Sequence, residues 1–153
     1  MRKCYYISGH LDLTEDEFKE HYIPLIDKAL SEDAPFVVGD AKGADLMAQQ
    51  YLHGKTDKVR VFHMYDNPRN NVGFFTVAGF ESDEGRDSEM TLYSTNDIAW
   101  VRNGRELSGT AANIDRRKEV EKRDKVFIKA IDEYIYKSSP LDLCDWEHMS
   151  IQA

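Results

Sequence analysis

Short runs of β-branched and aromatic residues alternate along the chain with longer segments of helical periodicity, and this alternation limits the fold more than any other feature. Four of these runs are predicted strands, at residues 3–7, 36–38, 58–63 and 97–101. Apolar residues at helical spacing predict helices at residues 14–30, 44–53, 84–94 and 110–136. Such alternation is typical of an α/β fold, in which helices cover a parallel sheet. We expect one domain over residues 1–137, followed by an irregular or weakly helical tail at 138–153.

The predicted helix at 14–30 has a clear start signal and one disturbance. Thr14 is followed three residues later by Glu17, which is the capping-box pattern. Pro24 lies inside the helix and predicts a kink.

The segment from Met64 to Ser82 breaks the alternation. It begins with turn-forming residues at 66–71, and glycines and aromatic residues follow. A connection of this length is uncommon inside a compact domain. Two interpretations remain open, a functional element such as a lid and a surface loop with its own apolar plug.

The charge and the length of the apolar runs exclude several classes of protein. The chain has 20 Lys and Arg against 28 Asp and Glu, a net charge of −8. Bulk nucleic-acid binding needs clustered positive charge, so we expect none, although a local basic pocket can still hold a small anion. No apolar run reaches the ~20 residues of a membrane span, and the N-terminal apolar run is too short for a secretory signal. We expect a cytoplasmic protein without membrane contact.

Metal and disulfide chemistry are not predicted either. Cys4 and Cys144 are far apart in sequence, and the five histidines have no ligand spacing. We therefore expect no metal site, no disulfide framework and no cofactor.

Three glycine-containing turns follow predicted strands. They are Ser8-Gly9, the segment Gly39–Gly43, and the segment from Gly104 to Thr110. In a parallel sheet all three lie at the carboxyl edge, where open α/β sheets bind ligands. Each turn leads towards a helix N-terminus, whose free N–H groups favour an anion, and glycine lets a phosphate approach the backbone. The alternative is that these glycines only shape the turns. Neither a Walker phosphate loop nor a dinucleotide Gly-x-Gly-x-x-Gly motif is present.

Arg86 shares one helix face with Glu89, Met90 and Tyr93, because these residues follow it at i+3, i+4 and i+7. Met and Tyr indicate that this face is partly buried. A buried guanidinium needs a partner, which is either a bound phosphate or Glu89 or another acid.

Several of these segments together resemble the SLOG superfamily, which includes Smf/DprA-like proteins, Lonely Guy phosphoribohydrolases and the YspA/YpsA-related group. Phe36–Asp45 resembles its glycine-rich second motif, and the Gly-Ala-Asp ending is most similar to the YspA-related branch. Arg86–Met90 is similar to the Arg-x-x-x-Met helix of Lonely Guy proteins. Ser108–Asn113 occupies the place of their Pro-Gly-Gly-x-Gly-Thr-x-x-Glu motif. The resemblance runs in order from Cys4 to Arg117.

The resemblance implies a Rossmann-like, doubly wound parallel sheet in three α/β/α layers that binds a nucleotide or a nucleotide-derived ligand. Some members of the superfamily cleave the base from a nucleoside monophosphate, and others act as ligand sensors. In the hydrolases an Arg and a Glu act together at the N-glycosidic bond. Arg86 matches that Arg, whereas Asn113 falls on the Glu position and brings no charge. Substitute carboxylates are available at Glu89, Asp40, Asp45 and Asp115.

The turns and the resemblance together predict one site. The predicted ligand-binding residues are Ser8, Gly9, His10, Gly39, Asp40, Lys42, Gly43, Asp45, Arg86, Met90, Ser108, Gly109, Thr110 and Asn113. The catalytic candidates are Arg86, Glu89 and Asn113. Three functions stay open, in this order: binding or sensing of a nucleotide-like ligand, hydrolysis or transfer at the N-glycosidic bond of a nucleoside monophosphate, and an oligomeric scaffold without ligand. The resemblance also implies a homodimer.

Overall fold

The computed structural model describes residues 2–137 and has the predicted α/β fold. Its sheet consists of β1 (Tyr5–Ile7), β2 (Phe36–Gly39), β3 (Val59–Met64), β4 (Phe75–Phe80) and β5 (Asn96–Ile98). Its helices are α1 (Glu15–His21), α2 (Ile23–Ser31), α3 (Ala44–Leu52), α4 (Asp83–Tyr93) and α5 (Gly109–Lys137). The strands are all parallel in the order β4-β3-β2-β1-β5.

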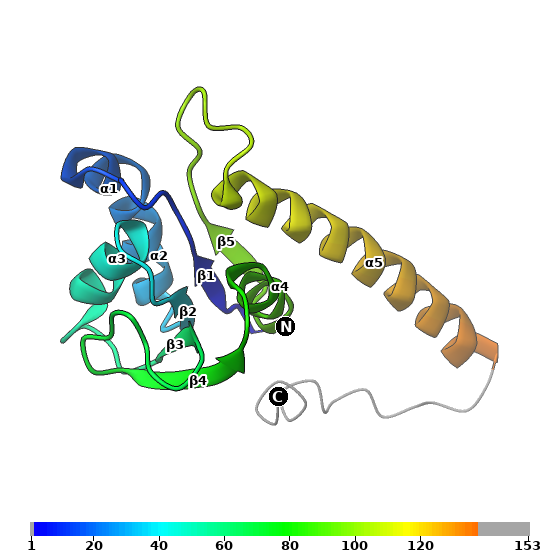
Figure 1. The fold of residues 1–153 in the computed structure, drawn as a ribbon. Helices are drawn as coiled ribbons and strands as arrows, with labels where there is room; N and C mark the ends of the chain where they lie inside the picture. Colours follow the sequence, from blue (N-terminus) through cyan, green and yellow to red (C-terminus); the bar gives the residue numbers. More distant parts are fainter. Residues whose placement is uncertain (1, 138–153) are drawn as a thin grey trace. The chain divides into compact units, whose positions relative to one another are not determined.

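Helices cover both faces of the sheet, as Figure 1 shows. Alternate residues of β1 and β2, such as Ile7 and Val38, pack in a large core with α1, α2 and α3. Tyr6 and Val37 point to the other face, where they form a smaller cluster with Met90 of α4. This alternation is the two-residue period of a strand, and it confirms the three-layer α/β/α arrangement.

The strand order reverses between β1 and β5. The chain builds β1 to β4 outward in one direction and then returns to place β5 on the other side of β1. Ligands of open α/β sheets bind outside the carboxyl ends of the strands at such a switch point. In this protein the loops after β1 and β5 flank the switch point.

The single helix predicted at 14–30 is in fact two helices. The Thr14 capping box forms as predicted, but α1 ends at His21 and α2 begins at Ile23, with Pro24 in the first turn of α2. Tyr22 joins them, and its buried hydroxyl donates to the Ser8 carbonyl at 2.8 Å and accepts from the Trp100 N–H at 3.2 Å. The joint therefore ties the two helices to the loops after β1 and β5.

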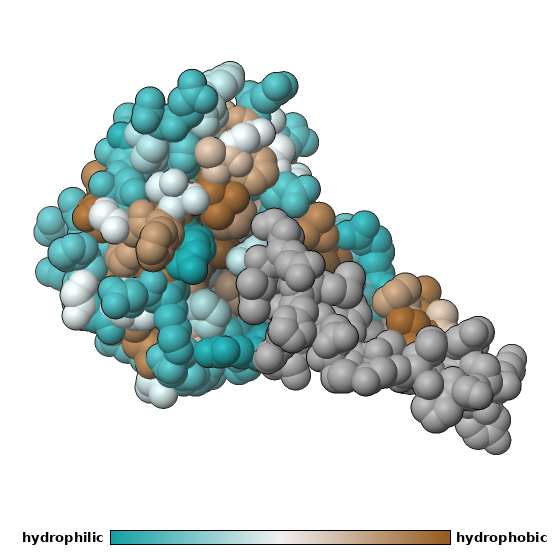
Figure 2. All heavy atoms as spheres, turned by 90° about the horizontal axis from the view of Figure 1, so that it is seen from below, coloured by the Kyte–Doolittle hydropathy of each residue, from teal (hydrophilic) through white to brown (hydrophobic). Residues whose placement is uncertain are grey.

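The segment from 64 to 82 contains a strand that the sequence analysis did not predict. β4 lies at the edge of the sheet and pairs with β3, and its side chains are half-buried or exposed. The loop before β4 carries the plug that one interpretation expected, because Phe74 packs against the large core. Figure 2 shows a face of the molecule on which apolar patches alternate with hydrophilic residues.

Helix α5 is continuous from Gly109 to Lys137, in agreement with the helix predicted at 110–136. It passes from a compact unit that ends at Arg117 into a second unit that begins at Lys118. The tail predicted at 138–153 lies outside the described residues. Among residues 2–137, no helix has both the length and the hydrophobicity that a membrane crossing demands.

Candidate functional site

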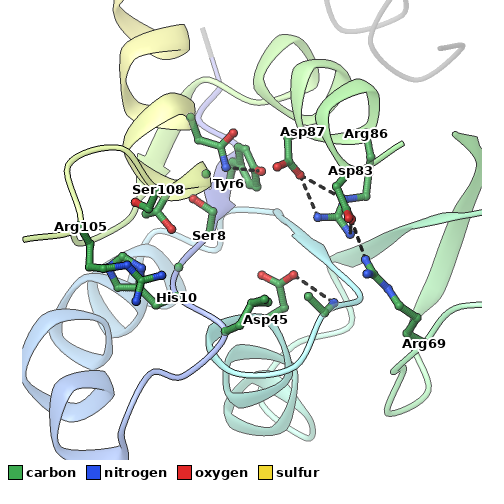
Figure 3. A pocket seen from close by; sticks show the side chains of 16 residues that line it. Tyr6, Ser8, His10, Asp45, Arg69, Asp83, Arg86, Asp87, Arg105 and Ser108 are labelled. Atoms are coloured by element: carbon green, nitrogen blue, oxygen red, sulfur yellow. Dashed lines mark hydrogen bonds and ion pairs between the residues drawn. The ribbon is translucent and has the colours of Figure 1, made fainter. Parts of the chain in front are cut away.

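A cavity of about 280 Å³ lies at the carboxyl ends of the central strands, beside the switch point (Figure 3). Its walls come from β1, from the loops after β1, β2, β3 and β5, and from the starts of α3, α4 and α5. Nine of the predicted site residues line it: Ser8, Gly9, His10, Asp45, Arg86, Ser108, Gly109, Thr110 and Asn113.

The other predicted residues lie behind or away from this cavity. Asp40 is buried beneath it, and Met90 is buried in the smaller core cluster. Lys42 and Glu89 are exposed and do not line the cavity. Glu89 is therefore not placed to act on a ligand there.

Two glycines, Gly39 at the end of β2 and Gly43 in the loop after it, hold the site in shape without lining it. A Cβ on Gly39 would stand 2.5 Å from Asp45 Oδ2 and 3.1 Å from Arg86 Cζ, so only glycine leaves room for both side chains. Gly43 has φ +76° and precedes α3, where a side chain would collide with the backbone carbonyls of His10 and Leu11. Both glycines therefore serve the close packing of the turns.

One wall of the cavity offers hydrogen-bond donors. The Ser8 hydroxyl is buried and, within the described residues, has no hydrogen-bond partner. Beside it, α5 begins at Gly109, and the Ser108 hydroxyl caps the helix by accepting from the Ala111 N–H at 3.2 Å. The first N–H groups of a helix have no acceptor within the helix, and its dipole is positive at this end. Donors grouped in this way can bind an anion.

His10 and Arg105 extend the same wall. His10 Nε2 accepts a hydrogen bond from the Arg102 N–H at 2.9 Å, which requires that nitrogen to be unprotonated. Burial, followed by the nearby charges of Arg105 and Arg102, lowers the pKa of His10. Nε2 of His10 therefore acts as an acceptor, and the cation of this wall is Arg105, whose guanidinium also lies 3.7 Å from Asp12.

The opposite wall is acidic. Asp45 is buried at the start of α3, and its Oδ2 accepts from the Ala41 N–H at 3.2 Å. Burial raises the pKa of Asp45 to about 7, although Arg86 acts in the opposite direction. Asp83 and Asp87, from the first turns of α4, line the same side.

Arg86 is held by carboxylates other than Glu89. Its guanidinium lies 2.7 Å from Asp40, 2.9 Å from Asp87 and 3.2 Å from Asp83, with only 5% of the residue exposed. Burial alone would raise the pKa of Asp40, but the hydrogen bonds and charge of Arg69, with the charge of Arg86, hold it below its ordinary value. The charge of Arg86 is thus already compensated inside the protein.

Asn113 is also engaged within the protein. Its Nδ2 donates to the Tyr6 hydroxyl at 3.0 Å, and its Oδ1 accepts from Arg116 at 2.6 Å. Burial, with the charges of Asp87 and Asp45, raises the pKa of Tyr6, so this hydroxyl stays protonated. Asn113 is therefore positioned to hold Tyr6 in the cavity wall, a role that an amide performs without charge.

Sequence reasoning missed several residues of the cavity. Tyr6, Leu11, Ala41, Arg69, Asp83, Asp87 and Arg105 line it but were not predicted. Asp83 and Asp87 had a signal, because acidic residues favour the first turns of a helix and flank Arg86 in sequence. Arg69 and Arg105 lie in loops whose path follows from tertiary contacts.

No metal centre forms in the part of the chain that the structure describes, since no three His, Cys, Asp or Glu side chains are grouped suitably there. Comparison with known proteins identifies no family: no family model matches the chain, and neither the curated proteins nor the solved structures contain a significant match.

Proposed function

We propose that the protein binds a small nucleotide or nucleotide-derived ligand, and that the ligand's phosphate lies against Ser8 and the N-terminus of α5. The observation that carries this proposal is the Ser8 hydroxyl, which is buried and unpartnered within the described residues and lines the cavity. Leaving a buried polar group unsatisfied costs about 1–3 kcal/mol. A phosphate oxygen at this place would accept from Ser8 and from the amides that begin α5.

The test compares a phosphorylated with an unphosphorylated ligand. Calorimetric titration of AMP and adenosine into the wild-type protein should give tighter binding of AMP. Ser8→Ala should weaken AMP binding about tenfold or more, because a hydrogen bond to a charged group contributes about 1.5–3 kcal/mol. Ser31→Ala removes an exposed hydroxyl of α2 and serves as the matched control.

The stability of the same variant separates a binding role from a structural one. Because Ser8→Ala removes an unsatisfied group, its thermal unfolding temperature should stay equal or rise. Equal affinities for AMP and adenosine, or unchanged AMP affinity in Ser8→Ala, would contradict the proposal and favour a scaffold without ligand.

Hydrolysis at an N-glycosidic bond is the second candidate, and one observation favours it. Of the four substitute carboxylates considered from the sequence, only Asp45 lines the cavity. A carboxylate facing the sugar could stabilise an oxocarbenium-like centre. Release of free base from nucleoside monophosphates at about one per second or faster, abolished by Asp45→Asn, would favour this activity over sensing.

A further inference from the structure

The two walls of the cavity differ in charge, and this difference limits the chemical groups that the ligand can carry besides its phosphate. Figure 3 shows Ser8, His10, Arg105 and Ser108 on one side and Asp45, Asp83 and Asp87 on the other. The first wall presents donors and the start of α5, whereas the second presents carboxyl groups. A ligand that fits both walls must be anionic at one end and rich in hydrogen-bond donors at the other.

An anion is excluded from the acidic wall in spite of its arginines. Arg86 is surrounded by Asp40, Asp83 and Asp87, and Arg69 donates to Asp40 and Asp83 at 2.8 Å each. Together these two arginines are outnumbered by the carboxylates that contact them. A second phosphate here would meet uncompensated negative charge.

The acidic wall retains unused acceptor capacity. Within the described residues, Asp45 accepts from the Ala41 N–H, and Asp87 accepts from Arg86 through Oδ1 and is hydrogen-bonded to the Tyr6 side chain. A carboxylate offers about four acceptor positions, so both groups can take further donors from a ligand. A hydroxyl group can donate to these carboxyl groups and also accept from the arginine N–H groups of the same wall, whereas an ammonium group can only donate.

We propose that Asp45 and Asp87 accept hydrogen bonds from the sugar hydroxyls of the bound ligand, so that the cavity selects a pentose phosphate unit. This inference rests on the proposed function, since it takes the phosphate to lie at Ser8. The cavity, at about 280 Å³, has room for such a unit. Selectivity would then come from hydroxyls that a deoxy analogue lacks, because the analogue leaves the carboxyl groups without their donors.

The decisive experiment keeps the phosphate and varies the hydroxyls. AMP, 2′-deoxy-AMP and 3′-deoxy-AMP are titrated calorimetrically into the full-length wild-type protein. At least one deoxy analogue should bind about tenfold or more weakly than AMP, the scale of a hydrogen bond to a charged group. Equal affinities for all three compounds would overturn the inference while leaving phosphate binding intact.

Variants of the acidic wall test whether its carboxyl groups contact the sugar hydroxyl. In Asp45→Asn or Asp87→Asn the discrimination between AMP and the deoxy analogue should shrink to about threefold or less. Asp57→Asn, an exposed position that precedes β3, should retain the full discrimination. Unchanged discrimination in both cavity variants would also overturn the inference.

Two further probes separate this inference from the proposed function. Phosphoethanolamine carries a cation in place of the hydroxyls, and tighter binding of it than of ribose 5-phosphate would identify the wall as an amine site and refute the sugar assignment. Failure of AMP and inorganic phosphate alike to bind would reject the proposed function itself, and this inference with it.

Discussion

Asp45 shows how one buried residue links the site to the stability of the fold. Its pKa in the folded protein is about 7, against an ordinary value of 3.8, because burial disfavours the charged form. Well below pH 4 the group is protonated in both the folded and the unfolded chain. As the pH rises towards 7, the unfolded chain loses this proton before the folded one does. Asp45 therefore makes the fold less stable as the pH rises from 4 to 7.

Replacing Asp45 by Asn should remove this pH dependence. Between pH 5 and pH 8 the wild-type free energy of unfolding should fall by about 2 kcal/mol more than that of Asp45→Asn. Urea denaturation of both proteins at the two pH values measures the difference. Asp57→Asn should follow the wild type, and parallel pH profiles for Asp45→Asn and the wild type would show that Asp45 titrates normally.

Residue identity alone predicted the surroundings of Arg86 only in part. Its helical spacing with Met90 correctly indicated a buried face, which the structure confirms. Its partners were not predictable, because Asp40 lies 46 positions earlier and meets Arg86 only when β2 and α4 are packed. Asn113 is similar, since its contact with Tyr6 joins positions 107 apart. Local patterns identify which side chains are buried, and tertiary contacts decide what they bind.

At the scale of elements, Gln49 of α3 fixes the loop between β3 and β4. The side chain is fully buried and donates to the carbonyls of Gly39 and Asn70 at 3.0 and 3.2 Å. It also accepts from the Val72 N–H at 3.1 Å. One amide thus fastens a loop that has no helix or strand of its own to the end of β2.

Gln49→Ala should therefore loosen this loop. The change leaves buried backbone groups without partners and opens a cavity, so we expect a loss of about 2–4 kcal/mol in the free energy of unfolding. Hydrogen exchange at Val72 should accelerate by at least tenfold. The exposed neighbour provides the control, since Gln50→Ala should change stability by less than about 0.5 kcal/mol. Unaltered exchange at Val72 in Gln49→Ala would contradict this role.

The segment from Met64 to Ser82 shows where hydrophobic periodicity fails to predict an element of secondary structure. β1, β2, β3 and β5 were predictable because each contains buried β-branched or aromatic residues next to a turn. β4 is an edge strand, and most of its residues, such as Phe75, are exposed, so its sequence shows no regular alternation of apolar and polar residues. Gly79, whose φ is +102°, interrupts the strand further. The break at Tyr22 was also hidden, because the apolar spacing of α1 continues into α2.

At the scale of the molecule, the candidate site belongs to one compact unit. Every residue that lines the cavity lies between Tyr6 and Asn113, and the unit ends at Arg117. Arg117 is buried and reaches three partners within it: the Thr91 carbonyl, Ser94 and Asp97. It thereby fastens the first turns of α5 to the end of α4 and to β5. This anchoring holds the helix N-terminus beside Ser8.

Arg117 and the C-terminal part of α5 should differ in how much they contribute to stability and to ligand binding. Truncation after Lys125 keeps Arg117 and two further helical turns, so ligand binding should stay within about threefold of the wild type. Arg117→Ala in the full chain should instead cost about 3–5 kcal/mol of stability, because it strips a buried guanidinium from Asp97 and from two carbonyl groups. Chemical denaturation and AMP titration of both proteins provide the comparison, with Arg123→Ala as the exposed control on the same helix. A truncated protein that folds but fails to bind AMP would show that the second unit contributes to the site.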